Sequence, residues 1–411
     1  MKRRVVITGL GVVCPLGHNK EDLLEAIKSS LCAIGPISHY DASGDDVTLA
    51  GEVKEFKDKD LLDAKAARRM DLVNQYGLVA GIKAYRDSGL TSSGTRHGVN
   101  VGSGIGGINT IQEESFKACK SGFSRISPFF IPKVISNMVA AYLAIELQFN
   151  GSCKCPVTAC ASGTDAIGEA FHSIRDGYLD VVLCGGAEAG INPLAIGGFA
   201  SMKALSTSKD PKRASIPFDK ERSGFVMGEG AGILVLEELG HALERGAKIY
   251  AEIIGYGSTC DAGHITQPSP GGELAFRAME MALEDGGLSP EDLDYINAHG
   301  TSTALNDKTE TQAIKKLLGE HVKDVFVSSS KSMMGHLLGA SGAVEAIVTL
   351  VAMDQGILPA NVGYKVADEE CDLNLVLEPR NYEFKTAMSN SFGFGGHNAS
   401  ILFRKWEDSE I

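Results

Sequence analysis

Cys160 has the sequence surroundings of a nucleophile. It stands in Pro156-Val-Thr-Ala-Cys160-Ala-Ser-Gly163, where we expect a strand to turn into a helix that ends near Gly177. A thiol at a helix N-terminus gains thiolate character, because the free N–H groups and the helix dipole stabilise negative charge. The same N–H groups can hold the oxyanion of a reacting carbonyl. A cysteine flanked by small residues is more often a packed core residue, so its role depends on its partners.

Two histidines in the second half of the chain are the candidate partners. His299 follows an apolar segment at residues 295–298, and His336 lies in Lys331-Ser-Met-Met-Gly-His336-Leu-Leu-Gly339. The carboxyl ends of strands are where α/β proteins place their ligands. Each histidine alone is more often structural, but a Cys–His pair within reach of one substrate would support nucleophilic catalysis.

An internal duplication relates these residues to one another. Three pairs of segments match in the same order: 84–104 with 282–302, 161–179 with 340–358, and 231–238 with 399–406. Short apolar strands alternate with helical patterns throughout, which indicates an α/β fold. We therefore predict two related halves, residues 1–250 with the nucleophilic cysteine and residues 251–411 with the two histidines.

The duplication strengthens the catalytic interpretation. Cys160 directly precedes one Ala-Ser-Gly helix start, and His336 lies four residues before the other. Equivalent strand-to-helix turns would point both side chains toward a cleft between the halves. The glycine-rich segment Ser389-Asn-Ser-Phe-Gly-Phe394-Gly-Gly-His397-Asn398 could supply a second oxyanion donor there, since glycines bring backbone N–H groups close to a substrate.

Composition excludes several function classes. Acidic residues outnumber basic ones by 52 to 39, a net charge of −13, which argues against nucleic-acid binding. The nine scattered cysteines form neither a disulfide framework nor a zinc motif, and they suit a reducing cytoplasm. No apolar stretch approaches the roughly 20 residues that span a bilayer. We expect a cytoplasmic protein with no membrane segment.

One glycine motif points to a different function. Gly102-Ser-Gly104-Ile-Gly-Gly107 satisfies the dinucleotide-binding pattern G-x-G-x-x-G after a plausible strand. The acidic residue expected about 20 positions later is missing, because that region reads Phe116-Lys-Ala-Cys-Lys-Ser-Gly. We therefore interpret residues 102–107 as a structural turn.

Several segments together resemble the elongating β-ketoacyl-[acyl-carrier-protein] synthases of the thiolase-like superfamily. They are TACASG, NAHGTST, KSMMGHLLGASGAVEA, FDKERSGFVMGEGAG and NSFGFGG, and the resemblance covers essentially the whole chain. It implies a thiolase-like fold of duplicated α/β halves in α-β-α-β-α layers, with a catalytic set of Cys160, His299 and His336. Initiating synthases carry Asn in place of the second His, and thiolases use a second Cys. Some relatives carry Thr where His397 stands, and the role of His397 is open.

The resemblance also implies a reaction: decarboxylative condensation of malonyl-carrier protein with an acyl group held on Cys160, without a cofactor. It implies that Lys331 tunes the histidines, that Thr301 and Thr303 contact the phosphopantetheine arm, and that Phe394 supplies an oxyanion N–H and gates the acyl pocket. Family members are homodimers, in which Ile105 lies deep in the acyl pocket and Phe130 lines the partner's pocket. The implied carrier-protein dock comprises Lys65, Arg68, Arg69, Arg125 and Lys203. A monovalent cation is implied near Asn297, Glu345, Ser389 and Asn390.

Three alternatives remain at this stage. An iterative polyketide-type ketosynthase shares the same three catalytic residues. A chain-length-factor-like partner without turnover lacks the nucleophilic cysteine, so Cys160 argues against it. A Cys–His hydrolase does not need two donor histidines and Lys331. The acyl chain length is not specified by the sequence.

Overall fold

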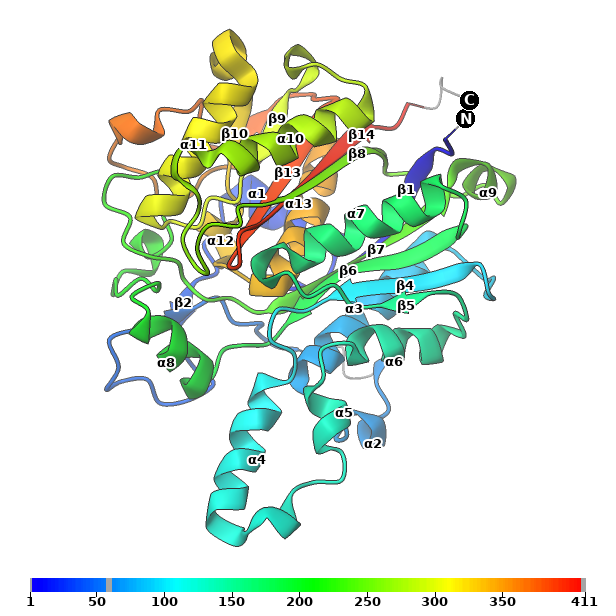
Figure 1. Ribbon diagram of the computed structural model, residues 1–411, viewed down its shortest axis with the longest axis vertical. Coiled ribbons are helices and arrows are strands. Elements are labelled where there is room, and N and C mark those ends of the chain that lie inside the picture. Colours follow the sequence, from blue (N-terminus) through cyan, green and yellow to red (C-terminus); the bar gives the residue numbers. More distant parts are fainter. Residues whose placement is uncertain (1, 57–60, 408–411) are drawn as a thin grey trace.

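The computed structural model describes residues 2–56 and 61–407, and its centre is one ten-stranded sheet (Figure 1). The first half contributes β1 (Val5–Val13), β7 (Gly230–Glu238), β6 (Val181–Glu188), β4 (His97–Gly102) and β5 (Cys153–Lys154). The second half contributes β8 (Ala251–Cys260), β14 (His397–Lys405), β13 (Thr386–Gly393), β9 (Tyr295–Asn297) and β10 (Phe326–Ser328). The halves join where β1 pairs with β8 through three antiparallel residue pairs, Val5 with Ile253, Val6 with Glu252 and Ile7 with Ala251.

The two halves repeat one topology. In the order β1-β7-β6-β4-β5, the first two pairings are antiparallel and the last two are parallel. The order β8-β14-β13-β9-β10 repeats the same sequence of directions. The predicted duplication of the fold is therefore confirmed.

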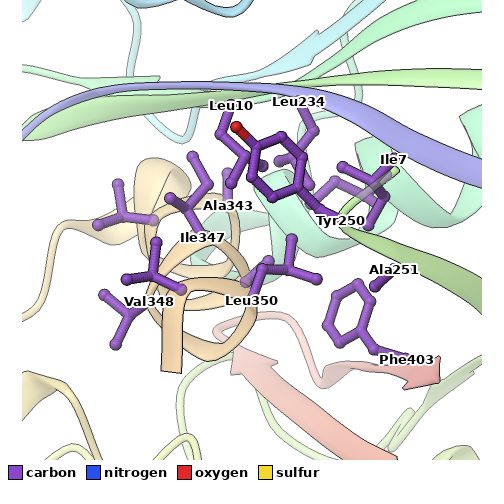
Figure 2. Packing of buried hydrophobic residues seen from close by; sticks show 14 of the residues in the cluster. Ile7, Leu10, Leu234, Tyr250, Ala251, Ala343, Ile347, Val348, Leu350 and Phe403 are labelled. Atoms are coloured by element: carbon purple, nitrogen blue, oxygen red, sulfur yellow. The ribbon is translucent and has the colours of Figure 1, made fainter. Parts of the chain in front are cut away.

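The strands of the first half and those of the second form two β layers, and helices between and outside them complete a five-layer arrangement. α7 (Ser162–Arg175) and α13 (Ser341–Gln355) contact each other and strands of both halves, so they form the middle layer. α3 (Leu72–Ser88) covers the outer face of the first half, and α10 (Glu273–Gly286) covers that of the second. In Figure 2, Ile347 and Leu350 of α13 pack among side chains from β1, β7, β8 and β14. This shared apolar core fixes the halves as one unit.

The outer helices lie unusually close to the sheet. A Cβ atom on Gly11 of β1 would approach the carbonyl oxygen of Ala80 in α3 to 1.9 Å. At the equivalent place in the second half, a Cβ on Gly257 of β8 would approach the carbonyl oxygen of Ala278 in α10 to 2.0 Å. Part of the glycine excess is thus explained by backbone approach.

The remaining elements surround this frame. They are α1 (Lys20–Ser29), α2 (Ala64–Ala67), α4 (Ile108–Ser121), α5 (Phe130–Val134), α6 (Met138–Leu147), α8 (Pro193–Ser201), α9 (Leu239–Glu244), α11 (Ala304–Leu318), α12 (Lys331–Met334) and the short pairs β2 (Gly35–Pro36) with β3 (Leu49–Ala50) and β11 (Ile357–Leu358) with β12 (Arg380–Asn381). Within the described ranges, every helix is too short or too polar to cross a bilayer.

Candidate active site

Cys160 lies in a strained turn at the start of α7. The 3-10 turn Ala159–Ala161 precedes the helix, and Ala159 is held at a φ of 52°. The turn before α13, Leu338–Ala340, has Leu338 at a φ of 49°. A left-handed backbone costs a non-glycine residue about 1 kcal/mol or more. Both halves carry this strained turn, and Cys160 in one corresponds to Gly339 in the other.

The structure brings the three predicted catalytic side chains to one cavity. Cys160, His299 and His336 line a space of about 370 Å³ together with Phe394. The two imidazole rings lie 5.3 Å apart between centroids and nearly perpendicular, at 85°. Both histidines are 2% exposed, which leaves them accessible only through this cavity.

The thiol of Cys160 differs from the expectation drawn from its helix position. Burial raises the pKa of Cys160 to about 12, although Lys331 and the backbone N–H groups of Phe394 and Cys160 act to lower it. Desolvation of a thiolate outweighs the helix N-terminus here. The resting residue is a neutral thiol, and the two N–H groups at its sulfur are placed to receive negative charge once it forms.

His336 has a defined protonation pattern. Its Nδ1 accepts a hydrogen bond from the Leu338 N–H at 3.3 Å and lies 2.8 Å from Ser341 Oγ. An accepting Nδ1 leaves the proton of the neutral ring on Nε2. Burial, followed by the charge of Lys331, lowers the pKa of His336 well below its usual value. His336 is thus a neutral donor.

His299 is held through its backbone rather than its ring. The Glu310 carboxylate accepts from the N–H groups of His299 at 2.8 Å and Gly300 at 2.7 Å. The buried Nδ1 has no hydrogen-bond partner among the described residues. Burial, then Lys331 and His336, lower the pKa of His299 well below its usual value, so this imidazole is neutral as well.

Lys331 is a fully buried cation beneath the two histidines. Its Nζ lies 2.5 Å from Oε1 of the equally buried Glu345. Burial raises the pKa of Glu345, and Lys331 acts against that shift. Lys331 also lies close enough to both imidazoles to act on them electrostatically, which lowers the pKa of His299 and of His336.

The predicted cation group is brought together only in part. Asn297 Oδ1, Glu345 Oε2 and Ser389 Oγ are buried without partners in the described part of the chain, and Asn297 and Ser389 are paired across β9 and β13. Unpaired oxygens suit a hard cation, so these three residues fit the group. The side chain of the neighbouring Asn390 has partners within the chain, since its amide oxygen accepts from Ser400 Oγ and its NH2 donates to Glu310.

A second, apolar chamber of about 330 Å³ adjoins the first. Ile105 and Leu338 line it, as the acyl-pocket expectation for Ile105 requires. The two chambers share four residues, which are Cys160, Phe199, Met202 and Phe394. The thiol and the Phe394 side chain thus stand where the chambers meet.

The other predicted contact residues lie at the mouth or outside. Thr301 and Thr303 line the first chamber, with their hydroxyls 2.9 Å apart, and exposed Lys203 lies at its rim. Phe130 begins α5 and lines neither chamber. His397 faces Cys260 across β14 and β8. Burial raises the pKa of Asp165, and His397 is among the groups that act against that shift.

The structure does not gather the predicted docking residues within one chain. Lys65, Arg68, Arg69 and Arg125 are exposed, and Arg69 stacks over the Phe129 ring at 4.8 Å next to α5. In Figure 1, α2 and α5 lie on one side of α4, whereas α8, which precedes Lys203, lies on the other.

Sequence reasoning missed two groups that hold the catalytic set. Glu310 comes from α11, eleven residues beyond His299, and Ser341 opens α13. Neither belongs to a recognisable chemical pattern, because each acts through a backbone or ring contact that only the folded chain creates. The Ala-Ser-Gly helix start was a signal for Ser341, since serine is a common residue at helix N-termini.

Comparisons with known proteins agree with this geometry. Family models described as "Beta-ketoacyl synthase, N-terminal domain" and "Beta-ketoacyl synthase, C-terminal domain" match residues 2–242 and 250–365. The chain is 48% identical to 3-oxoacyl-[acyl-carrier-protein] synthase 2 of Synechocystis sp., covering 99% of each chain. It is 46% identical to the enzyme of the same name from Staphylococcus aureus, covering 98% of this chain and 99% of that one.

Solved structures give the same relationship. A β-ketoacyl synthase from Burkholderia phymatum superposes with a TM-score of 0.92 at 35% identity, covering 99% of this chain and 100% of that one. A ketosynthase solved with a type II polyketide acyl-carrier protein superposes with a TM-score of 0.92 at 33% identity and the same coverage. The predicted resemblance is confirmed.

Proposed function

This chain belongs to the β-ketoacyl synthase family, and from that premise we propose that it is a 3-oxoacyl-[acyl-carrier-protein] synthase that elongates fatty acyl chains by two carbons. The observation that carries the proposal is the cavity lined by Cys160, His299 and His336 beside an apolar chamber. The 46–48% identity to 3-oxoacyl-[acyl-carrier-protein] synthase 2 enzymes over nearly the full length favours this activity over the polyketide alternative, since the ketosynthase solved with a type II polyketide acyl-carrier protein is 33% identical.

In the first half-reaction, the acyl group moves to the enzyme. Cys160 Sγ attacks the thioester carbon of the acyl-carrier protein, and the N–H groups of Cys160 and Phe394 stabilise the tetrahedral oxyanion. The bond to the carrier sulfur breaks as the new thioester forms, and the proton of Cys160 leaves with that thiol. The acyl chain then occupies the apolar chamber lined by Ile105.

In the second half-reaction, malonyl-carrier protein enters the cavity past Thr301 and Thr303. Neutral His299 and His336 donate hydrogen bonds to its thioester oxygen and stabilise the enolate as CO2 leaves. The enolate carbon attacks the acyl thioester, a carbon–carbon bond forms, and the Cys160 sulfur departs and takes up one proton. The energy comes from CO2 loss and thioester cleavage, so no cofactor enters the balance.

The depressed histidine pKa values suit this chemistry. A neutral imidazole donates to a developing enolate and stays a donor as the charge grows, whereas an imidazolium would transfer its proton to the enolate and quench it. Burial is the main reason that both rings are neutral, Lys331 acts in the same direction, and Glu345 pairs with that lysine.

We further propose that the enzyme is a homodimer that docks an acidic carrier protein. Exposed apolar side chains on and around α4 and α5, including Phe116, Phe123 and Ile131, form a surface suited to a second copy. In such a dimer Phe130 would face the partner's acyl chamber. The carrier would be attracted by basic residues of both protomers. One protomer would supply Lys203, and the other would supply Lys65, Arg68, Arg69 and Arg125.

The test is a condensation assay with acyl- and malonyl-loaded carrier protein, read by mass spectrometry. We expect a 3-oxoacyl-carrier product two carbons longer than the acyl donor, and no such product from the C160A variant. A protein that folds, accepts acyl groups and forms no longer product would contradict the proposal. Release of free acid instead would favour the hydrolase.

A further inference from the structure

Glu188 is a buried carboxylate that the reaction above does not use. It ends β6, is 0% exposed and accepts four hydrogen bonds, all from uncharged donors. Oε1 accepts from Ser103 Oγ at 2.9 Å and the Ile105 N–H at 3.2 Å. Oε2 accepts from the N–H groups of Gly104 at 2.7 Å and Gly339 at 3.0 Å. Two of its donors, Gly104 and Ile105, line the apolar chamber. A buried ionisable group in this position, with no cationic partner among the described residues, is a candidate for a functional role.

The glycine motif at residues 102–107 is the cradle for this carboxylate. A Cβ on Gly104 would come within 2.8 Å of Glu188 Oε2, and a Cβ on Gly102 would come within 2.5 Å of the Ser162 carbonyl oxygen. Successive backbone N–H groups form an anion-binding concavity, which elsewhere holds phosphate. Here the anion is supplied by the protein itself.

The cradle connects the apolar chamber to a catalytic histidine. Ile105, whose N–H binds Glu188, and Leu338, which precedes the Gly339 N–H, both line the apolar chamber. The Leu338 N–H in turn donates to Nδ1 of His336. One carboxylate therefore holds the turn of the first half that carries Ile105 and the turn of the second half that sets the His336 proton on Nε2.

We propose that Glu188 is a positioning residue that sets both the acyl length accepted by the apolar chamber and the donor state of His336. Without its two oxygens the turns at residues 103–105 and 338–339 lose their common acceptor. Ile105 and Leu338 are then free to shift, and the Leu338 N–H that donates to His336 Nδ1 shifts with them. The inference rests on the proposed function, because it concerns the acyl chamber of that reaction.

Two variants separate the two parts of the proposal. In E188Q the amide oxygen can still accept from the N–H groups of Gly104 and Gly339, and the amide NH2 can donate to Ser103 Oγ. The NH2 group cannot accept from the Ile105 N–H, so that hydrogen bond is lost. We expect the ratio of kcat/KM values for 16-carbon and 8-carbon acyl-carrier proteins to change by about 5-fold or more, because an unmade buried hydrogen bond is costly. E188A removes all four acceptor contacts. In a C160Q background, it should also lower malonyl decarboxylation by about 10-fold or more.

The matched control is E237Q. Glu237 is equally buried and lies on β7 opposite Val181, at the far end of β6, where Arg245 and Thr8 bind it. We expect E237Q to lower the melting temperature and leave the acyl-length ratio as in the wild type. An E188Q ratio equal to that of E237Q would overturn the chamber role, and undiminished decarboxylation in C160Q/E188A would overturn the His336 role. If E188A does not fold, the E188Q ratio still decides the inference. A wild-type protein that makes no longer product with any donor would overturn the proposed function instead.

Discussion

Replacing Lys331 by Met tests the charge balance beneath the two histidines. Lys331 and Glu345 are both 0% exposed, with 2.5 Å between Nζ and Oε1. Methionine fills a similar volume without the charge, so in tetramethylammonium chloride, where no small cation can bind Glu345 Oε2, the Glu345 carboxylate would remain alone in the interior. Removing one partner of a buried ion pair costs about 3–5 kcal/mol. We expect the free energy of unfolding of K331M to fall by that amount at pH 8.

The loss of unfolding free energy in K331M should depend on pH in a defined direction. Burial raises the pKa of Glu345 in the folded protein, and loss of Lys331 raises it further. A group whose folded pKa is raised contributes stability below its unfolded pKa, and that stability is lost as the pH rises through the folded value. The destabilisation of K331M should therefore shrink at pH 5, where Glu345 takes up a proton.

The double variant K331M/E345Q separates stability from catalysis. It has no buried charge at this place, so its unfolding free energy should return to within about 1 kcal/mol of the wild-type value. Catalysis should not return, because Lys331 lowers the pKa values of His299, His336 and Cys160. In both variants the acid limb of the malonyl decarboxylation rate should move to higher pH.

Urea denaturation at pH 5 and 8 and pH–rate profiles measure these outcomes. An unfolding free energy of K331M within about 1 kcal/mol of the wild-type value at pH 8 would refute the expected cost of an uncompensated Glu345 carboxylate. Recovery of full decarboxylation with an unchanged acid limb in the double variant would show that Lys331 does not tune the histidines.

Three further outcomes are expected. C160Q should retain malonyl decarboxylation while losing condensation, measured by CO2 release, since the amide mimics the acyl-enzyme and leaves both histidines in place. Burial raises the pKa of Glu310 to about 7, so the stability that its protonated form contributes is lost as the pH rises through that value. The unfolding free energy of E310Q, measured by urea titration, should therefore rise relative to that of the wild type between pH 5 and pH 8. Replacing sodium or potassium chloride by tetramethylammonium chloride at equal ionic strength should lower the melting temperature, because the oxygens of Asn297, Glu345 and Ser389 would lose their cation.

The sequence indicated more of the fold than of the chemistry. The repeated segments predicted the duplicated halves because strand and helix patterns are local, and the strand order of both halves agrees with them. The meeting of Cys160 with His336 was expected from the equivalence of two turns, and His299 was expected there because it follows the carboxyl end of a strand. These were inferences from periodicity, which survives in a linear chain.

What the sequence could not predict depends on distances in the folded chain. The high pKa of Cys160 follows from its depth, which the helix-start pattern does not reveal. Glu188 and Glu310 act by accepting backbone N–H groups, and any glutamate can do so once folding brings it there. The hydrogen bonds of the Asn390 side chain to Ser400 and Glu310 likewise depend on segments that only folding brings together.

The two strained turns have taken different roles. The turn at residues 159–161 presents the Cys160 sulfur, whereas the turn at residues 338–340 has Gly339 at the same position and no side chain. A Cβ on Gly339 would lie 2.4 Å from the Gly104 nitrogen and 2.8 Å from Glu188 Oε2. The space that a second nucleophile would need is already filled by the loop that supports the first. The two turns share a backbone conformation, but only the first has room for a reactive side chain. Mutation of Gly339 alone therefore cannot convert the enzyme into one with two reactive centres. The specialisation of the halves is fixed by steric exclusion.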